Sequence, residues 1–94
     1  MDITGEIKEI GQLIVSTALL HEIREQVSSV MKQGFVVTDG SHHPLGSGYD
    51  VVVKCGSDNH SNVSRRIRGT VKNVQVDRIA DGVLGIKTAR RVRN

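Results

Sequence analysis

The stretch VQVDRIADGVLGIK, residues 74–87, contains the clearest structural signal in the sequence. In its first part valines alternate with polar residues, and Arg78 is a candidate for the same alternation; residues 83–87 form a second apolar run after Asp81 and Gly82. A period of two is typical of a strand with one buried face. Asp-Gly suits a tight type I′ turn, in which both central residues have positive φ. This stretch therefore predicts a β-hairpin.

Two further strands are predicted upstream, at residues 35–37 and 49–55, where apolar and β-branched residues are consecutive. The connection between them, residues 38–48, holds three glycines and the single proline, so it is predicted to be a long loop. Its glycines could expose N–H groups to a phosphate. However, the loop does not lead into the helix of a P-loop or dinucleotide fingerprint, so an ordinary flexible loop is the favoured interpretation.

Two helices are predicted from apolar residues that recur every three or four positions. The first covers residues 17–33, and Gly34 can take the left-handed conformation that ends a helix. The second covers residues 61–73, where Val63 and Ile67 belong to one face.

Residues 3–16 leave two alternatives open. Four isoleucines between residues 3 and 14 have helical spacing, but their stripe points roughly 140° away from the stripe of residues 17–33. One straight helix could not bury both stripes in one core. Either a short helix precedes a break, or residues 10–16 form a first strand, which Gly5 and Gly11 favour because glycine weakens helices.

Together these elements predict a small single α+β domain covering residues 1–94, with an antiparallel or mixed sheet and two helices on one face. The approximate order is β?-α-β-β-α-β-β, where the first strand is the uncertain one. Phe35 and Tyr49 are the only aromatic residues of the 94, and such a short aliphatic chain buries limited surface. We therefore expect a homo-oligomer, most simply a dimer.

The sequence indicates a soluble, cytoplasmic protein with no membrane partner. Its acidic first residues lack the pattern of a secretory signal, and no apolar stretch approaches the roughly 18 residues that span a bilayer. Cys55 is the only cysteine, which suits a reducing compartment and, at the end of an apolar strand, indicates a packed thiol.

Charge is divided unevenly along the chain. Residues 1–47 have a net charge of −3, whereas residues 48–94 have +6. Eight of the cations in the second half belong to the second predicted helix, the end of the hairpin and the residues after it: Arg65, Arg66, Arg68, Lys72, Lys87, Arg90, Arg91 and Arg93. Arg65, Arg68 and Lys72 are three and four residues apart, which predicts one shared helical face.

These eight residues are the candidate nucleic-acid-binding site, on either DNA or RNA. Arginine forks bind phosphate oxygens in pairs, and no aromatic residue accompanies them, so contact with backbone phosphates is expected rather than base stacking. A solvated charged surface is the simpler interpretation of the same residues. The alternative function is an oligomeric interaction or regulatory module that binds an acidic protein or a small anionic ligand.

No cofactor, metal site or enzymatic activity is predicted. His42, His43 and His60, with nearby aspartates, match no zinc, calcium or metalloprotease spacing. No nucleophile, base and orienting group can be placed together from the sequence.

Overall fold

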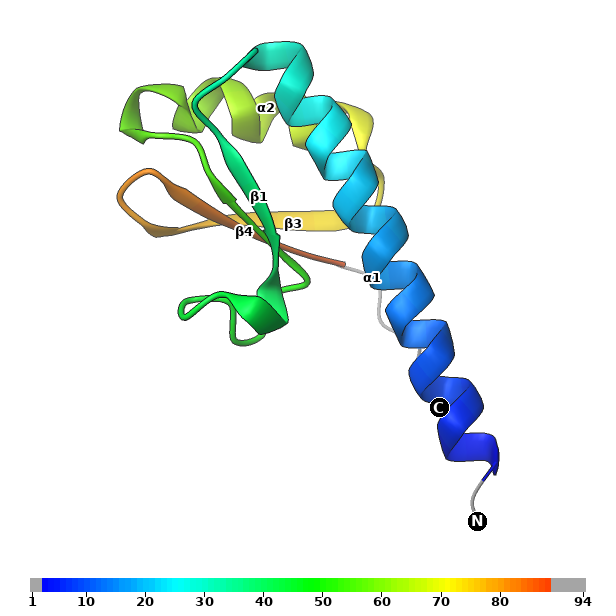
Figure 1. The fold of residues 1–94 in the computed structure, drawn as a ribbon. Coiled ribbons are helices and arrows are strands. Elements are labelled where there is room, and N and C mark those ends of the chain that lie inside the picture. Colours follow the sequence, from blue (N-terminus) through cyan, green and yellow to red (C-terminus); the bar gives the residue numbers. More distant parts are fainter. Residues whose placement is uncertain (1–2, 89–94) are drawn as a thin grey trace.

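The structure of the protein is a computed structural model that describes the backbone of residues 3–88 and the side chains of residues 17–88. In chain order the elements are α1 (Ile3–Val30), β1 (Val36–Asp39), the 3₁₀ turn η1 (Gly40–His42), β2 (Val51–Lys54), the 3₁₀ turn η2 (Ser57–Asn59), α2 (His60–Thr70), β3 (Val74–Ala80) and β4 (Val83–Thr88). Figure 1 shows the two helices and the sheet that they cover. The α+β class and the approximate element order are confirmed.

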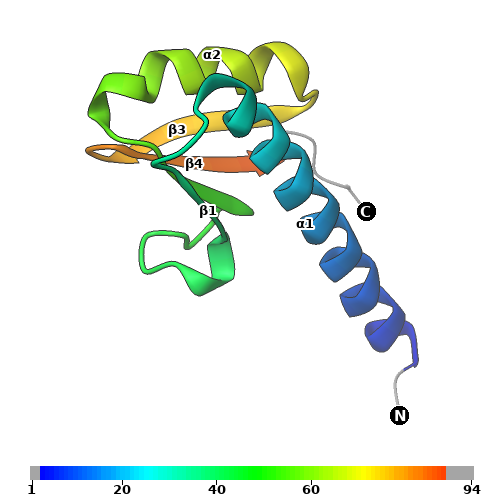
Figure 2. The same ribbon diagram turned by 45° about the horizontal axis from the view of Figure 1, so that its top comes forward.

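All four strands form one antiparallel sheet in the order β1-β2-β4-β3. The predicted hairpin is β3 and β4, and β4 lies between β3 and β2. Both helices pack on one face of the sheet, while the loop between β1 and β2 lies on the other face (Figure 2). Strands β1 and β3 are the two edges.

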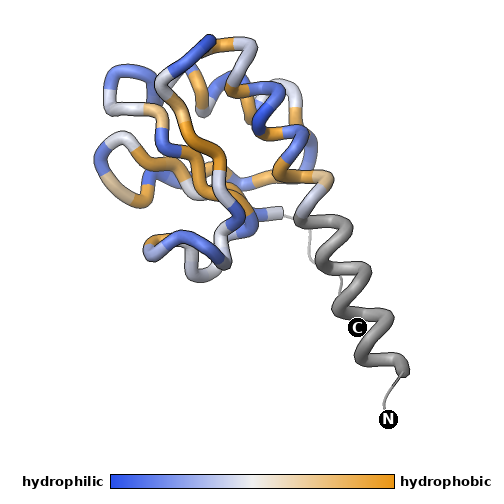
Figure 3. The backbone as a smooth tube through the Cα atoms, in the orientation of Figure 1, coloured by the Kyte–Doolittle hydropathy of each residue, from blue (hydrophilic) through white to orange (hydrophobic). Residues whose placement is uncertain are grey.

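The core lies between the helices and the sheet. Alternate residues of the central strands, such as Val51 and Val53 in β2, point toward the helices and are fully buried. Ile23 and Val27 of α1 and the apolar face of α2 fill the other side. Figure 3 shows apolar positions, in orange, concentrated along the strands. The apolar faces predicted for residues 17–33 and 61–73 therefore make the core contacts.

The interpretation of residues 10–16 as a strand is wrong, and no break separates two helices: α1 is one helix of 28 residues. A helix satisfies its backbone hydrogen bonds within itself, whereas a strand at these residues would need a neighbouring strand. The helix also ends earlier than predicted, at Val30, and Gly34 takes its left-handed φ of 83° in the connection that follows. Although α1 is long, no helix within residues 3–88 combines the length and apolarity needed to cross a membrane.

The β3–β4 turn has the predicted position but a different conformation. Gly82 has a φ of 78°, whereas the only non-glycine residue with positive φ in the described part of the chain is Asn73, so Asp81 does not follow the type I′ prediction. Arg78 pairs with Leu84 and Ala80 with Val83, which leaves Ile79 as an extra residue in β3. A bulge of this kind supplies the twist that a type I′ turn would otherwise supply.

The loop between β1 and β2 folds back under the sheet. Gly40 and Gly46 pack backbone against backbone, and a Cβ atom on Gly40 would collide with the carbonyl of Tyr49. Close packing within the loop explains both of these glycines. At the end of the loop, the Tyr49 ring packs against Gly85 of the central strand β4.

Candidate nucleic-acid interface

Helix α2 carries the basic residues because its sequence is strongly amphipathic. Val63 and Ile67 are fully buried, and Arg65, Arg66 and Arg68 are exposed. The eleven residues of α2 include no aspartate or glutamate. The helix therefore presents cations to solvent without carboxylates of its own to neutralise them.

A groove of about 690 Å³ separates α2 from the β3–β4 hairpin. Val76 and Leu84 line it from the sheet, and Gly69 lies at its helix side. Its polar lining consists of His60, Ser61, Ser64, Arg65, Arg68 and Arg78. None of the residues described as lining this α2–β3 groove is acidic.

Two of the groove arginines are held in place by short contacts. Arg68 Nη2 donates to the carbonyl oxygen of Val76 at 2.9 Å, which ties α2 to the edge strand β3. Arg78 Nη2 lies 2.9 Å from Asp81 Oδ1 in an exposed ion pair. Arg78 reaches the groove because it continues the alternation of Val74 and Val76, as the sequence suggested. Such an exposed pair is weak and leaves other guanidinium donors available.

Arg65 and Arg66 lie on the outer side of α2. Arg66 Nε donates to Oε1 of Gln26 on α1 at 3.0 Å. The side chain of Arg65 forms no hydrogen bond or ion pair with the residues that the structure describes. A second, smaller space of about 410 Å³, the α1–α2 depression, is lined by Val30, Asn62, Arg65, Arg66, Gly69 and Thr70.

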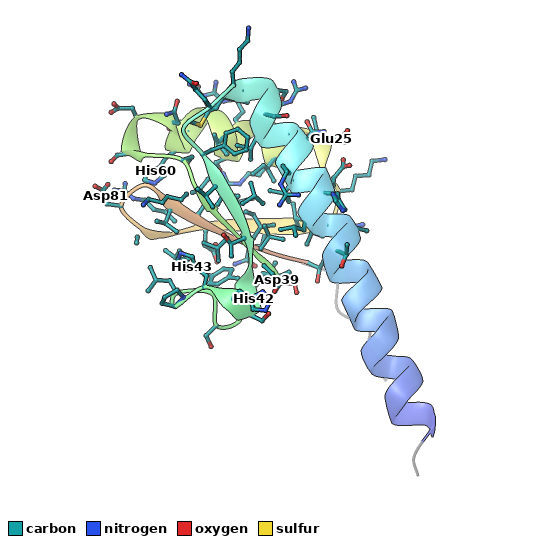
Figure 4. The ribbon with its side chains drawn as sticks, in the orientation of Figure 1. Glu25, Asp39, His42, His43, His60 and Asp81 are labelled. Atoms are coloured by element: carbon teal, nitrogen blue, oxygen red, sulfur yellow. The ribbon has the colours of Figure 1, made fainter. Side chains whose placement is uncertain are left out.

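His60 lines the groove and has one unpaired nitrogen, which is buried. Its Nε2 atom is buried and is the only buried side-chain nitrogen or oxygen among the described residues without a hydrogen bond. Figure 4 shows His60 at the start of α2. Because this nitrogen has almost no solvent-accessible surface, a ligand in the groove would reach it only after the side chain moved.

The remaining predicted site residues do not share this surface. Lys72 follows the end of α2 and is exposed, so the shared helical face predicted for it does not exist. Lys87 lies on the opposite face of the sheet, with Nζ 5.4 Å from the centroid of the Tyr49 ring. Arg90, Arg91 and Arg93 lie outside the described residues.

On that opposite face, Tyr49, Asp77 and Lys87 form a polar cluster. Tyr49 Oη donates to Asp77 Oδ2 at 2.9 Å, and the side-chain amide of Gln75 donates to both carboxylate oxygens. The bond from Gln75, followed by that from Tyr49, holds the pKa of Asp77 below its ordinary value. The same bond to Asp77 raises the pKa of Tyr49. Here Lys87 lies over the Tyr49 ring, on the face of the sheet opposite the α2–β3 groove.

The predicted site residues omitted four polar residues of the groove, namely His60, Ser61, Ser64 and Arg78. The alternation in β3 was a usable signal for Arg78, because it placed this arginine on the helix-facing side. Helix α2 packs against β3 through tertiary contacts, and no local sequence pattern predicts such contacts.

The histidines and the single cysteine form no common cluster in the described structure. Within the described residues no three histidine, cysteine, aspartate or glutamate side chains are grouped as a metal would require. Figure 4 shows His42 and His43 in the loop beneath the sheet, away from His60. Cys55 is buried, and burial raises the pKa of its thiol, as expected for a packed side chain.

Comparison of the chain with protein-family models, with curated proteins and with solved structures gave no match.

Proposed function

We propose that the protein binds nucleic acid, without catalysis, by holding backbone phosphates in the α2–β3 groove. The observation that carries this proposal is the groove itself, which brings Arg65, Arg68 and Arg78 together with no acidic residue in its described lining. Arginine donates two parallel hydrogen bonds to phosphate oxygens, and serine hydroxyls can add further ones. Release of condensed counterions would drive the association.

Phosphate contact suits this groove better than base stacking. The aromatic residues of the chain are Phe35 and Tyr49. Phe35 packs against the core, and Tyr49 lies on the other face of the sheet. A surface without an aromatic platform favours recognition of charge and shape over recognition of bases.

The decisive experiment compares Arg65→Ala with Lys54→Ala by fluorescence anisotropy on labelled duplex DNA and structured RNA over a salt series. Arg65 is the cleanest target because its side chain, unlike those of Arg66 and Arg68, bonds to no other described residue. Lys54 is exposed on β2 and points away from the helices, so its substitution removes one charge outside the groove.

The wild type should bind with affinity that falls steeply as salt rises, because each neutralised phosphate contributes about −0.9 to the log–log slope. Arg65→Ala should weaken all sequences alike and flatten that slope by roughly 1, while Lys54→Ala leaves the slope unchanged. Circular dichroism checks that both variants remain folded. Absence of wild-type binding at about 50 mM salt would contradict the proposal.

A small anionic ligand is the second candidate for the same groove. Its volume of about 690 Å³ lies within the usual range of small-molecule sites, and its described lining holds three arginines and two serines. Saturable binding of inorganic phosphate or a nucleoside monophosphate, with no gain from longer oligonucleotides, would favour this candidate.

We also propose that the chain forms a homo-oligomer, most simply a dimer, in the cytoplasm. The core is small and aliphatic, and Val36 and Leu45, which are 56% and 47% exposed, are large apolar side chains at the β1 edge and the adjoining loop. Light scattering should report a mass above the 10.3 kDa of one chain. A folded 10.3 kDa monomer at micromolar concentration would contradict it.

A further inference from the structure

Gly69 is an unexplained glycine within α2. Glycine weakens a helix because it loses more backbone freedom on folding than any other residue and covers none of the backbone. The positive-φ glycines of the described chain are Gly34, Gly48, Gly56 and Gly82, so Gly69 does not serve as a left-handed cap. A Cβ atom on Gly69 would meet nothing within 4 Å. The described structure therefore has room for alanine at this position.

Gly69 occupies a particular place between the two hollows described above. It lines both the α2–β3 groove and the α1–α2 depression, and Arg65, one turn earlier in α2, is the only other residue that lines both. Helix α2 forms the ridge between the hollows, and the ridge lacks a side chain at Gly69. A ligand that occupied both hollows would meet least obstruction there.

Arginines lie on both sides of α2 at Gly69. Arg68 and Arg78 line the groove toward β3, and Arg66 lines the depression toward α1. A single small anion could use only one of these sides. A chain of linked phosphates could use both, with Arg65 beside the crossing.

We propose that one sugar-phosphate strand of a nucleic acid crosses α2 over Gly69 and places phosphates in both hollows. The proposal rests on the nucleic-acid function proposed above and adds the path of the strand. The missing Cβ lets the sugar-phosphate backbone approach the helix backbone, which is a recurrent use of glycine at ligand sites. Gly69 would thus position the strand, and the binding of nucleic acid would offset the helix stability that glycine costs.

The test is Gly69→Gln, with Gly69→Ala as the milder variant. Both substitutions introduce better helix formers, so the thermal midpoint should rise. Binding of an oligonucleotide of roughly 12 residues should instead weaken, by about tenfold for glutamine and less for alanine. Anisotropy measures the binding and circular dichroism the melting.

Ser28→Gln is the matched control, because Ser28 is an exposed residue of α1 on the side away from Gln26. It should leave oligonucleotide binding unchanged. A dinucleotide has a single internucleotide phosphate and cannot place linked phosphates in both hollows, so it should bind wild type and Gly69→Gln equally.

The outcomes separate the two proposals. If wild type binds no nucleic acid, the proposed function fails. If wild type binds the oligonucleotide and both Gly69 variants bind it equally well, the crossing is overturned and the groove proposal stands. A lowered thermal midpoint in Gly69→Ala would also overturn the crossing, since glycine would then serve the fold.

Discussion

The two faces of the sheet are covered in different ways. On one face, Val53 and its alternate neighbours pack against two helices in an aliphatic core. On the other face, the β1–β2 loop folds back and the ring of Tyr49 lies on Gly85, held by the carboxylate of Asp77. The first face rests on many similar contacts, whereas the second depends on a few specific ones. The same substitution should therefore cost a different amount of stability on each face.

The largest expected effect comes from Val53→Ala and its neighbour Val52→Ala, a matched pair on one strand. Val53 is 0% exposed beneath the helices, and Val52 is 1% exposed on the loop side. Each change removes two carbons, or about 1.6 kcal/mol of transfer free energy. The rigid helix side should keep a cavity, so Val53→Ala should lose about 2 to 3 kcal/mol and Val52→Ala about 1.5 kcal/mol.

Urea unfolding of the two variants measures this difference. Equal losses would mean that the loop face is as rigid as the helix face, and the contrast between them would disappear.

Gly85→Ala should have the next largest effect, and it acts only on the loop face. A Cβ atom at this position would lie 2.6 Å from Cδ1 of Tyr49, so the ring must move. The expected loss is about 1 to 2 kcal/mol, as for moderate overpacking. The double variant Gly85→Ala/Tyr49→Ala should lose less than the sum of the single changes because the collision is gone. Additive losses would show that the ring does not rest on Gly85.

The smallest effect concerns the pH dependence of the bond between Tyr49 and Asp77. The lowered pKa of Asp77 contributes stability above its unfolded pKa, and this contribution is lost as pH falls through the folded value. The raised pKa of Tyr49 contributes stability below its unfolded pKa, and this is lost as pH rises through the folded value. Both groups are solvent-accessible, so screening keeps the contribution small.

An ultraviolet titration can follow Tyr49 alone, because the chain has one tyrosine and no tryptophan. In Asp77→Asn the titration midpoint of Tyr49 should move down toward its ordinary value. An unchanged midpoint would remove Asp77 as the partner.

The helix-covered face could largely be predicted from the sequence, and the loop-covered face could not. Val63 and Ile67 repeat at helical spacing, and Val74 and Val76 alternate, so local periodicity gave α2 and the hairpin. The contact between Tyr49 and Gly85 joins residues far apart in the sequence and has no periodic signal. In α1 the error came from requiring every apolar stripe to be buried in one core.

The candidate site could be predicted only in part, because local sequence patterns show which face a residue lies on but not which elements pack together. Arg65, Arg66 and Arg68 follow from the amphipathic pattern of α2. Lys87 was grouped with them from its charge, although the alternation after Leu84 and Ile86 places it on the opposite face. Arg78 joins the site only because α2 packs across β3.

The bond from Arg68 to the Val76 carbonyl bears on whether two chains can pair through the edges of their sheets. β3 is an edge strand, and a charged side chain fixed at an edge discourages a second chain from adding a strand there. Edge-to-edge growth of the sheet would then be directed to β1, where Val36 is exposed. Arg68→Ala would lose this protection along with one of the proposed phosphate contacts, so precipitation of the variant must be measured separately from its binding.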